Sequence, residues 1–155
     1  MAHESITIQS PYFIPNSAIM DAIEIAARSG IRVRVMIPSK PDHMFVYRAT
    51  EYYASVLAQE GIEVYAYNKG FLHSKTIVID DKIVSVGSAN MDIRSFALNF
   101  EVNAFLYSRN LALQMNHIFE KDLENSTLLT PKYFAKQSPW LRFKQFFSRL
   151  LTPIL

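Results

Sequence analysis

Strand-like and helix-like segments alternate through the first 67 residues of the chain. Polar and apolar residues alternate over Ser5–Gln9 and Ile31–Ile37, as in strands with one buried face, and Ile62–Tyr67 is a third predicted strand. Between them lie two predicted helices, Asn16–Ser29 with Asn16 as its N-cap and Phe45–Gln59, each followed by a glycine. This β-α-β-α-β order predicts an α/β fold with parallel pairing in its sheet.

Two adjacent strands are expected next, Lys75–Ile79 and Ile83–Val86, and the short polar link between them indicates a hairpin. A longer strand over Asn99–Tyr107 and a helix over Leu111–Leu123 complete the pattern. We therefore expect an α/β sandwich in which a mixed sheet carries helices on both faces. Because the composition changes after residue 124, we expect one domain over 1–124 and an extension over 125–155.

Charged residues are unevenly distributed along a chain whose net charge is only +2. Residues 1–124 carry 11 Lys and Arg against 14 Asp and Glu, a net charge of −3, whereas residues 125–155 carry five Lys and Arg and no acid. Half of the 155 residues are hydrophobic, which excludes disorder over most of the chain, and the absence of cysteine excludes disulfide scaffolds and thiolate metal sites. We expect no signal peptide, and the longest uncharged stretch is too short and too proline-broken to span a bilayer.

Residues that can carry chemistry are concentrated between positions 70 and 101. His73 and Lys75 stand two positions apart at the start of a predicted strand, so their side chains are expected to point the same way. Asp80 follows the apolar run of that strand, and the next strand ends in the sequence GSAN, residues 87–90, whose hydroxyl and amide can reach the same end of the sheet. Its glycine would allow a ligand to approach the backbone closely.

This pattern suits the transfer of a phosphodiester. A neutral imidazole can attack phosphorus when its other nitrogen keeps a proton on a fixed acceptor, and Glu101 is the candidate acceptor for His73. Lys75, Ser88 and Asn90 would bind the non-bridging oxygens and stabilise the charge that develops on them. Because the lysine supplies the positive charge, we expect neither a metal nor another cofactor.

Other interpretations of these residues stay open. The carboxylates at positions 80, 81, 92 and 101 could form a metal cluster, although no histidine spacing supports one. The histidine could be an ordinary surface residue, although a chance occurrence of both HxKxxxxD and GSxN is rare. Arg94 could bind a lipid phosphate or pair with a carboxylate, and Tyr12 could line the substrate site or simply pack in the core.

The segment HSKTIVID followed by GSAN resembles the HKD motif of the phospholipase D superfamily. The flanking segments SPYFIP, NKGFLHSK and SANMDIRSFALNFEVN, together with the basic hydrophobic tail, are similar to the carboxy-terminal half of bacterial cardiolipin synthases, over about Ser5–Leu155. The resemblance implies a phospholipase D-like sandwich and phosphatidyl transfer through a phosphohistidine, in which one phosphatidylglycerol donates its phosphatidyl group to another and glycerol is released. His73, Lys75 and Asp80 match the motif, Ser88 and Asn90 match its GSxN extension, and Glu101 matches the downstream acid.

The resemblance also implies that this chain holds one of two motifs. Full-length cardiolipin synthases have membrane-spanning helices and one HKD motif in each half, and neither the helices nor the first motif is found here; His3, His43 and His117 lack a lysine two residues later. In-line displacement needs a nucleophile and a proton donor on opposite sides of phosphorus, which one imidazole cannot supply. We therefore expect a second HKD half, from homodimerisation or from an amino-terminal half. The carboxy-terminal histidine is usually the general acid, and we expect Asp80 to be structural support.

The tail predicts a basic amphipathic helix that begins at Pro139. Its apolar positions, spaced by three and four residues, are Trp140, Phe143, Phe147, Leu150 and Ile154. Basic and polar residues fall on the opposite side. Such a helix suits an anionic membrane surface, but it could equally pack on the body or on a dimer mate. We expect a peripheral protein at the cytoplasmic side of the cell membrane, soluble as this chain alone, with phosphatidylglycerol as substrate.

Two rival functions remain. A homodimeric single-motif phosphodiesterase or nuclease would keep the fold, but its site should lie in a basic groove. Here residues 1–124 have a net charge of −3 and the excess of basic residues lies in the tail, so nucleic acid is not the expected partner. A catalytically silent half-domain, used for dimerisation or membrane docking, would also fit a chain with one motif.

Overall fold

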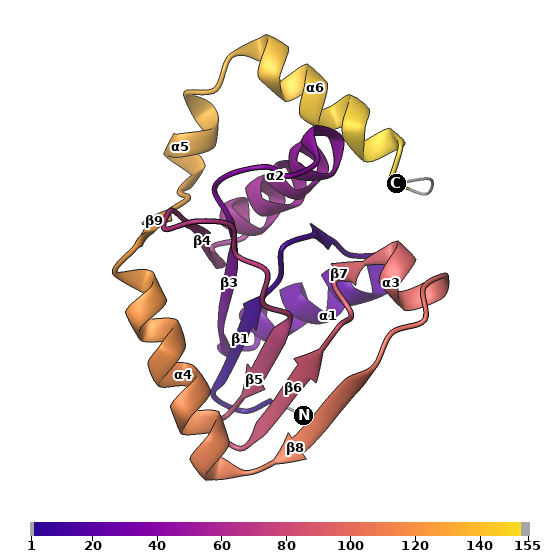
Figure 1. Ribbon diagram of the computed structural model, residues 1–155. Coiled ribbons are helices and arrows are strands. Elements are labelled where there is room, and N and C mark those ends of the chain that lie inside the picture. The colour runs from indigo at the N-terminus through magenta and orange to yellow at the C-terminus, as the bar shows by residue number, and fades with distance from the viewer. Residues whose placement is uncertain (1, 153–155) are drawn as a thin grey trace.

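A seven-stranded mixed sheet with helices on both faces forms the body of the protein, as the computed structural model shows for residues 2–152 (Figure 1). The strand order is β8-β6-β5-β1-β3-β4-β9. Three neighbouring strands, β1 (Ser5–Gln9), β3 (Arg32–Pro38) and β4 (Glu63–Tyr67), are parallel. The others join antiparallel, namely β5 (Thr76–Ile79), β6 (Ile83–Gly87), β8 (Asn103–Tyr107) and β9 (Ser126–Leu128). The predicted α/β sandwich and the hairpin after β5 are confirmed.

Two long helices cover one face of the sheet and a third covers the other. Helices α1 (Ser17–Arg28) and α2 (Met44–Gln59) share a core with the apolar residues of β1, β3 and β4. Helix α4 (Arg109–Leu123) packs on the opposite face, against β5 and β6 among others. The side chain of Asn16 accepts a hydrogen bond from the backbone N–H of Ile19 at 3.0 Å, so the predicted N-cap of α1 is confirmed.

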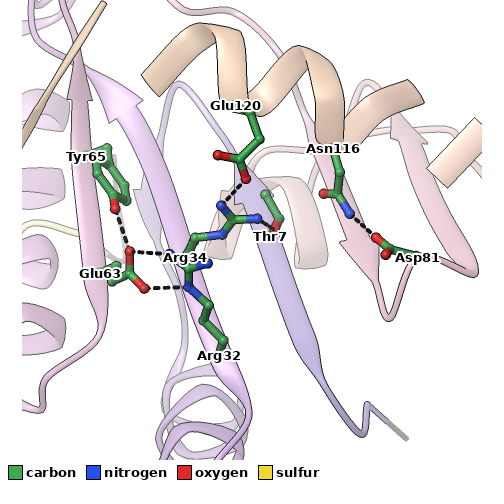
Figure 2. Close-up of polar contacts among 8 residues, drawn as sticks. All are labelled: Thr7, Arg32, Arg34, Glu63, Tyr65, Asp81, Asn116 and Glu120. Atoms are coloured by element: carbon green, nitrogen blue, oxygen red, sulfur yellow. Dashed lines mark hydrogen bonds and ion pairs between the residues drawn. The ribbon is translucent and has the colours of Figure 1, made fainter. Parts of the chain in front are cut away.

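Polar contacts fix α4 on the sheet (Figure 2). The buried guanidinium of Arg34 on β3 pairs with Glu120 of α4, donates to the hydroxyl of Thr7 at 3.2 Å and lies 4.8 Å above the ring of Phe119. One turn earlier, Asn116 donates to Asp81 beyond β5 at 2.5 Å. A buried charge is tolerated only when it is paired in this way. These contacts therefore set the position of α4 beside the strands that carry the candidate site.

The segment between β6 and β8 differs from the prediction. A strand was expected from Asn99, but β8 begins at Asn103, after a short strand β7 (Met91–Asp92) and helix α3 (Ile93–Ala97). The backbone N–H groups of Leu98 and Asn99 both donate to the carbonyl of Arg94, at 2.8 and 2.9 Å, and this closes the helix. Residues 99–102 therefore follow a helix end and lie before β8, although the carbonyl of Val102 accepts from the N–H of Ser88 at 2.9 Å. Strand β7 pairs in parallel with β2 (Phe13–Ile14), just beyond the end of β1.

Residues after 124 contribute to both sheet and core. Strand β9 pairs with β4, and Leu129 and Phe134 are buried in the larger core. Two further helices follow, α5 (Pro131–Ala135) and α6 (Pro139–Leu150). The predicted stripe of α6 is described as far as Leu150, whereas Ile154 lies outside the described residues. No helix within residues 2–152 is both long enough and apolar enough to cross a bilayer.

Candidate active site

The ends of four strands meet at one end of the sheet, which we call the site end. The register aligns Gln9 of β1 with Thr76 at the start of β5, and Gly87 at the end of β6 with Asn103 at the start of β8. The backbone N–H of Gly87 donates to the carbonyl of Lys75 at 3.4 Å. The HSK and GSAN segments, fourteen positions apart, therefore lie side by side as the sequence predicts.

His73 and Lys75 precede β5 rather than belonging to it. The imidazole of His73 is exposed, and its ring centre lies 5.8 Å from that of Phe71. The ammonium of Lys75 donates to the backbone carbonyl of His73 at 2.9 Å. The two residues are thus neighbours, and the imidazole is open to an incoming substrate.

Lys75 lies among carboxylates. Burial lowers the pKa of its ammonium below the usual range, while Glu101, Asp42 and Asp92 act against that shift. A partly desolvated cation of this kind strengthens electrostatic contact with an anionic oxygen. Asp42, in the loop between β3 and α2, escaped the sequence analysis because it belongs to no motif.

Tyr12 donates its hydroxyl to Asp42. Burial and this hydrogen bond to a carboxylate raise the pKa of the Tyr12 phenol well above its ordinary value. Tyr12 also lines a cavity of about 130 Å³ beside the site, together with Asn90 and Asp92. Of the two interpretations of Tyr12, the structure favours a place at the site.

A hydrogen-bonded network links Glu101 to the GSAN segment. Its carboxylate accepts from the hydroxyl of Ser88, and from the hydroxyl of Ser95 at 3.2 Å. Ser95 in turn accepts from the backbone N–H of Asn90 at 3.2 Å. The hydroxyl of Ser88 and the other polar donors near Glu101 hold the pKa of that carboxylate below its usual range.

This network departs from two expected contacts. Glu101 was expected to accept a hydrogen bond from His73, but no hydrogen bond joins these two described residues, and Ser88 and Ser95 take that place. The proton of Ser88 is directed at Glu101 while its oxygen accepts from the N–H of Val102 at 3.0 Å, so this hydroxyl supports the network and is not free to donate to phosphate. Ser95, which no motif marks, joins Glu101 to Asn90.

Asn90 has an unused polar atom. Its carbonyl oxygen Oδ1 is buried and has no hydrogen-bond partner within the described part of the chain. A buried acceptor without a donor is costly, and such groups in native structures call for an explanation. Asn90 also lines the 130 Å³ cavity, and its unpaired oxygen can accept a hydrogen bond from a ligand hydroxyl but cannot bind a phosphate oxygen.

Gly87 serves the sheet rather than a ligand. A Cβ atom at this position would come within 2.1 Å of the carbonyl oxygen of Val102 and 2.6 Å of the Cα of Asn103. The close approach that glycine allows is therefore that of β8, not that of a substrate. This corrects the sequence-based interpretation of Gly87, because β8 occupies the space.

Asp80 lies at the opposite end of β5, which we call the turn end. Its carboxylate accepts from the backbone N–H groups of His3, Glu4 and Ser5 at 2.7, 2.8 and 2.9 Å. Burial alone would raise the pKa of Asp80, but these donors bring it below the ordinary value. The structure thus keeps Asp80 apart from the other motif residues. It also separates Asp80 and Asp81 from Asp92 and Glu101, and no three potential metal ligands gather in residues 2–152.

Large apolar side chains are exposed beside the site and along β8. They are Phe96, Leu98, Phe100, Val102, Phe105 and Tyr107. Strand β8 is also an edge strand, with no neighbour on its outer side among the described strands. Many exposed apolar side chains close together in sequence, beside an unpaired strand edge, are typical of a protein–protein interface.

Comparison with known proteins identifies related chains. A family model described as the cardiolipin synthase, PLD-like domain matches residues 1–123. A cardiolipin synthase from Listeria welshimeri is 54% identical over 154 residues, which are 99% of this chain and 32% of that protein, so the chain spans about a third of the length of this relative.

Two solved structures share the fold. Nuc from Salmonella typhimurium, a phospholipase D family member, has a TM-score of 0.70 at 23% identity and is covered over 84% of its chain by 83% of this one. Phosphatidylserine synthase from Haemophilus influenzae has a TM-score of 0.74 at 15% identity, over 99% of this chain and 40% of its own.

Proposed function

The chain belongs to the cardiolipin synthase family of phospholipase D-like domains, and from this premise we propose that it supplies the carboxy-terminal HKD half of a phosphatidyltransferase that makes cardiolipin. The observation that carries the proposal is the meeting of an exposed His73 with the partly desolvated ammonium of Lys75, beside the GSAN segment, at one end of the sheet. No metal or other cofactor is needed for this chemistry.

The proposed reaction has two displacements at phosphorus. An imidazole nitrogen attacks the phosphodiester of one phosphatidylglycerol, a phosphorus–nitrogen bond forms, and the bond to the glycerol headgroup breaks. The leaving glycerol oxygen takes a proton from a general acid. A hydroxyl of a second phosphatidylglycerol then attacks the phosphohistidine and loses its proton to the same group, now a base, so that cardiolipin forms and the imidazole is released.

Each residue of this chain has a proposed role in that sequence. His73 is the general acid and base when an amino-terminal half supplies the nucleophile, and one of two His73 residues is the nucleophile when two copies pair. Lys75 and the Nδ2–H groups of Asn90 donate to the non-bridging oxygens. Ser88 and Glu101 position the GSAN segment, and Asp80 supports the start of β1 from the turn end.

A second HKD half is a proposed partner. The exposed apolar side chains near the site, including Phe100, Phe105 and Tyr107, support this proposal because they would otherwise stay in contact with water. The partner half is an amino-terminal half or a second copy of this chain. Its imidazole would face His73 across the phosphate, since in-line displacement needs groups on both sides.

The proposed substrate, phosphatidylglycerol, lies in a bilayer, so the proposed place of action is the cytoplasmic surface of the cell membrane. Five Lys and Arg without an acid in residues 125–155 support attraction to anionic lipid. An anionic membrane surface is therefore the other proposed partner.

A chimeric enzyme tests the proposal. In the Listeria welshimeri cardiolipin synthase, the 154 residues that this chain matches are replaced by this chain, and the formation of cardiolipin and glycerol from phosphatidylglycerol vesicles is measured. We expect an active chimera that loses about 10²- to 10⁴-fold in rate with His73→Ala. The matched control is His117→Ala, which changes an exposed histidine on α4.

Two results would contradict the proposal. A folded chimera that makes no cardiolipin, together with a chain that cleaves DNA on its own, would favour the homodimeric nuclease. A folded chimera that is inactive with both lipid and DNA would favour a catalytically silent half-domain.

A further inference from the structure

Helix α6 contacts the body through its polar edge. Gln145 is buried and donates to Glu51 of α2 at 3.3 Å and to Gln137 at 2.9 Å. Ser148 is also buried, and the guanidinium of Arg149 lies 5.0 Å above the ring of Tyr52 of α2. An amphipathic helix normally buries its apolar side. Here the polar edge is the one held by α2, so the apolar side needs another explanation.

The aromatic residues of α6 stay about half exposed. Trp140 and Phe143 are 63% and 55% exposed, and Phe147 is 47% exposed. Their rings stack in a row, with centres 5.6 Å apart between Trp140 and Phe143 and 6.4 Å apart between Phe143 and Phe147. The ammonium of Lys144 lies 5.3 Å above the ring of Trp140. Three aligned rings beside a lysine form an ordered apolar surface with a basic rim.

The start of α2 extends this surface. Met44 and Phe45 are 54% and 56% exposed and, with Arg48, face α6 across a groove of about 430 Å³ that the three rings also line. We call Met44, Phe45, Trp140, Phe143 and Phe147 the aromatic face. Because it is built from two helices far apart in sequence, the amphipathic pattern of the tail could not reveal it in full.

The positive charge around the aromatic face favours an anionic partner. Residues 125–155 carry five Lys and Arg and no acid, and Lys144 stands on the rim of the groove. A cationic rim complements an anionic lipid surface, and tryptophan and phenylalanine are the residues that enter the boundary between headgroups and acyl chains. The apolar surface beside β8 has no comparable excess of positive charge, since residues 96–107 contain one acid and no lysine or arginine.

The carboxyl end of α6 lies at the same end of the molecule as the site. Thr152, two residues beyond α6, lines the 130 Å³ cavity together with Asn90 and Asp92. In Figure 1 the carboxyl end of α6 approaches α3 and β7, whereas the turn between β5 and β6 lies at the other end of the sheet. A surface on which α6 rests would therefore lie next to the site.

We propose that the aromatic face docks onto an anionic bilayer and holds the site against the lipid headgroups. Trp140, Phe143, Phe147, Met44 and Phe45 enter the interface, while Lys144 contacts lipid phosphates. The role of docking rests on the proposed function, because a phospholipid substrate is what the site would meet there. The docking itself can be measured without turnover.

Trp140 is the single tryptophan of the chain and reports docking directly. The purified chain is mixed with vesicles of phosphatidylcholine alone or of phosphatidylcholine with phosphatidylglycerol, and tryptophan emission and co-flotation are recorded. We expect a blue shift, protection from iodide quenching and co-flotation only with the anionic vesicles, weakened by salt. An emission spectrum that stays unchanged at a large excess of anionic vesicles would overturn the proposal.

Variants separate docking from folding and from catalysis. Phe143→Ser with Phe147→Ser should lower the vesicle partition constant about tenfold or more, whereas the matched double variant Phe105→Ser with Tyr107→Ser on β8 should bind as the parent does. Lys144→Glu should weaken anionic binding, and His73→Ala should leave it unchanged. Equal loss in both double variants would contradict the proposal.

Self-association provides the remaining outcome. If sedimentation shows a dimer that Phe143→Ser with Phe147→Ser dissociates, the aromatic face belongs to a second copy and the proposal is overturned. Vesicle binding without transfer activity in the chimera would instead leave docking intact and count against the proposed function alone.

Discussion

The polar and charged groups at the two ends of strand β5 differ in how fully they are hydrogen-bonded. At the turn end, the Asp80 carboxylate is buried and satisfied by three backbone N–H groups. At the site end, Lys75 is partly desolvated among carboxylates and donates only to a backbone carbonyl, and Asn90 nearby has an unpaired oxygen. Full satisfaction is typical of a residue that stabilises the fold, and incomplete satisfaction of one that awaits a ligand.

Among variants that compare the charged and polar residues of the two ends, the largest effect is expected from loss of the Lys75 cation. Lys75→Met in the chimera should lower the rate of cardiolipin formation by about 10²- to 10³-fold, because the charge that would stabilise the phosphate oxygens is removed. The free energy of unfolding should change little, because the ammonium's burial opposes its attraction to the surrounding carboxylates. Lys69→Met, at an exposed lysine, is the control for both measurements. A stability loss as large as the kinetic loss would mean that the site end is structural as well.

Gly87 provides an exception within the site end. Gly87→Ala should destabilise the fold by about 2–4 kcal/mol, because its Cβ would meet the backbone of β8. Urea unfolding measures this. Gly61→Ala is the matched control, since Gly61 has a φ of +80° but open space around it, and should cost about 1–2 kcal/mol. If the two variants lose equal stability, the clash with β8 is relieved by movement and β6 is not held tightly.

Asp80→Asn examines the turn end. Asparagine tolerates the φ of 51° at this position, so the substitution removes mainly the charge that three N–H donors share. We expect a loss of about 1–3 kcal/mol at neutral pH. Asp81→Asn, also at a φ of 51°, should cost less, because Asp81 accepts from a single side chain, Asn116.

The effect of Asp80 should depend on pH. The pKa of Asp80 is lower in the folded protein than in the unfolded chain. Its contribution is therefore present above the unfolded value of about 3.9 and is lost as the pH falls through the folded pKa. Urea unfolding of parent and Asp80→Asn should converge in acid, and a difference that persists well below that range would show that the charge is not the cause.

The smallest effect is expected from Tyr12→Phe. The substitution removes the hydroxyl that donates a hydrogen bond to Asp42. Because this hydrogen bond is exposed, the free energy of unfolding should fall by less than about 1 kcal/mol. The chimera's rate should stay within about threefold of the parent's, since Tyr12 is proposed to lie beside the phosphate and not to contact it. A hundredfold loss would place the Tyr12 hydroxyl at the reacting atoms and would enlarge the site end.

Local patterns account for what the sequence predicted correctly. Asn16 caps α1, and the strands around the HSK and GSAN segments follow from alternation and from a short polar link, all of which depend on neighbouring residues. The extra helix at Ile93–Ala97 escaped prediction because its first turn depends on the Asp92 side chain, which accepts from the N–H of Ser95 at 2.6 Å. The alternating pattern expected for a strand over Asn99–Tyr107 concealed the end of this helix.

Contacts between distant segments account for most of what was missed. Asp42 approaches Lys75 only because β3 and β5 flank β1 in the folded sheet. Glu101 accepts hydrogen bonds from Ser88 and Ser95 in place of His73, and the bond from Ser95 forms because helix α3 brings its hydroxyl within 3.2 Å of the carboxylate. The exposure of the α6 aromatics goes with the contact of Gln145 with Glu51, which no pattern within α6 contains. Such pairings need the whole fold.

The anchoring of residues 3–5 by Asp80 has a practical consequence for handling the protein. Because this carboxylate binds the backbone at the turn end, a purification tag or fluorophore attached ahead of His3 would lie at that end, away from His73 and Lys75. Thr152, in contrast, lines the 130 Å³ cavity, so a label at that residue would lie beside the site. Amino-terminal labelling is therefore the arrangement that leaves assays of lipid access and turnover undisturbed.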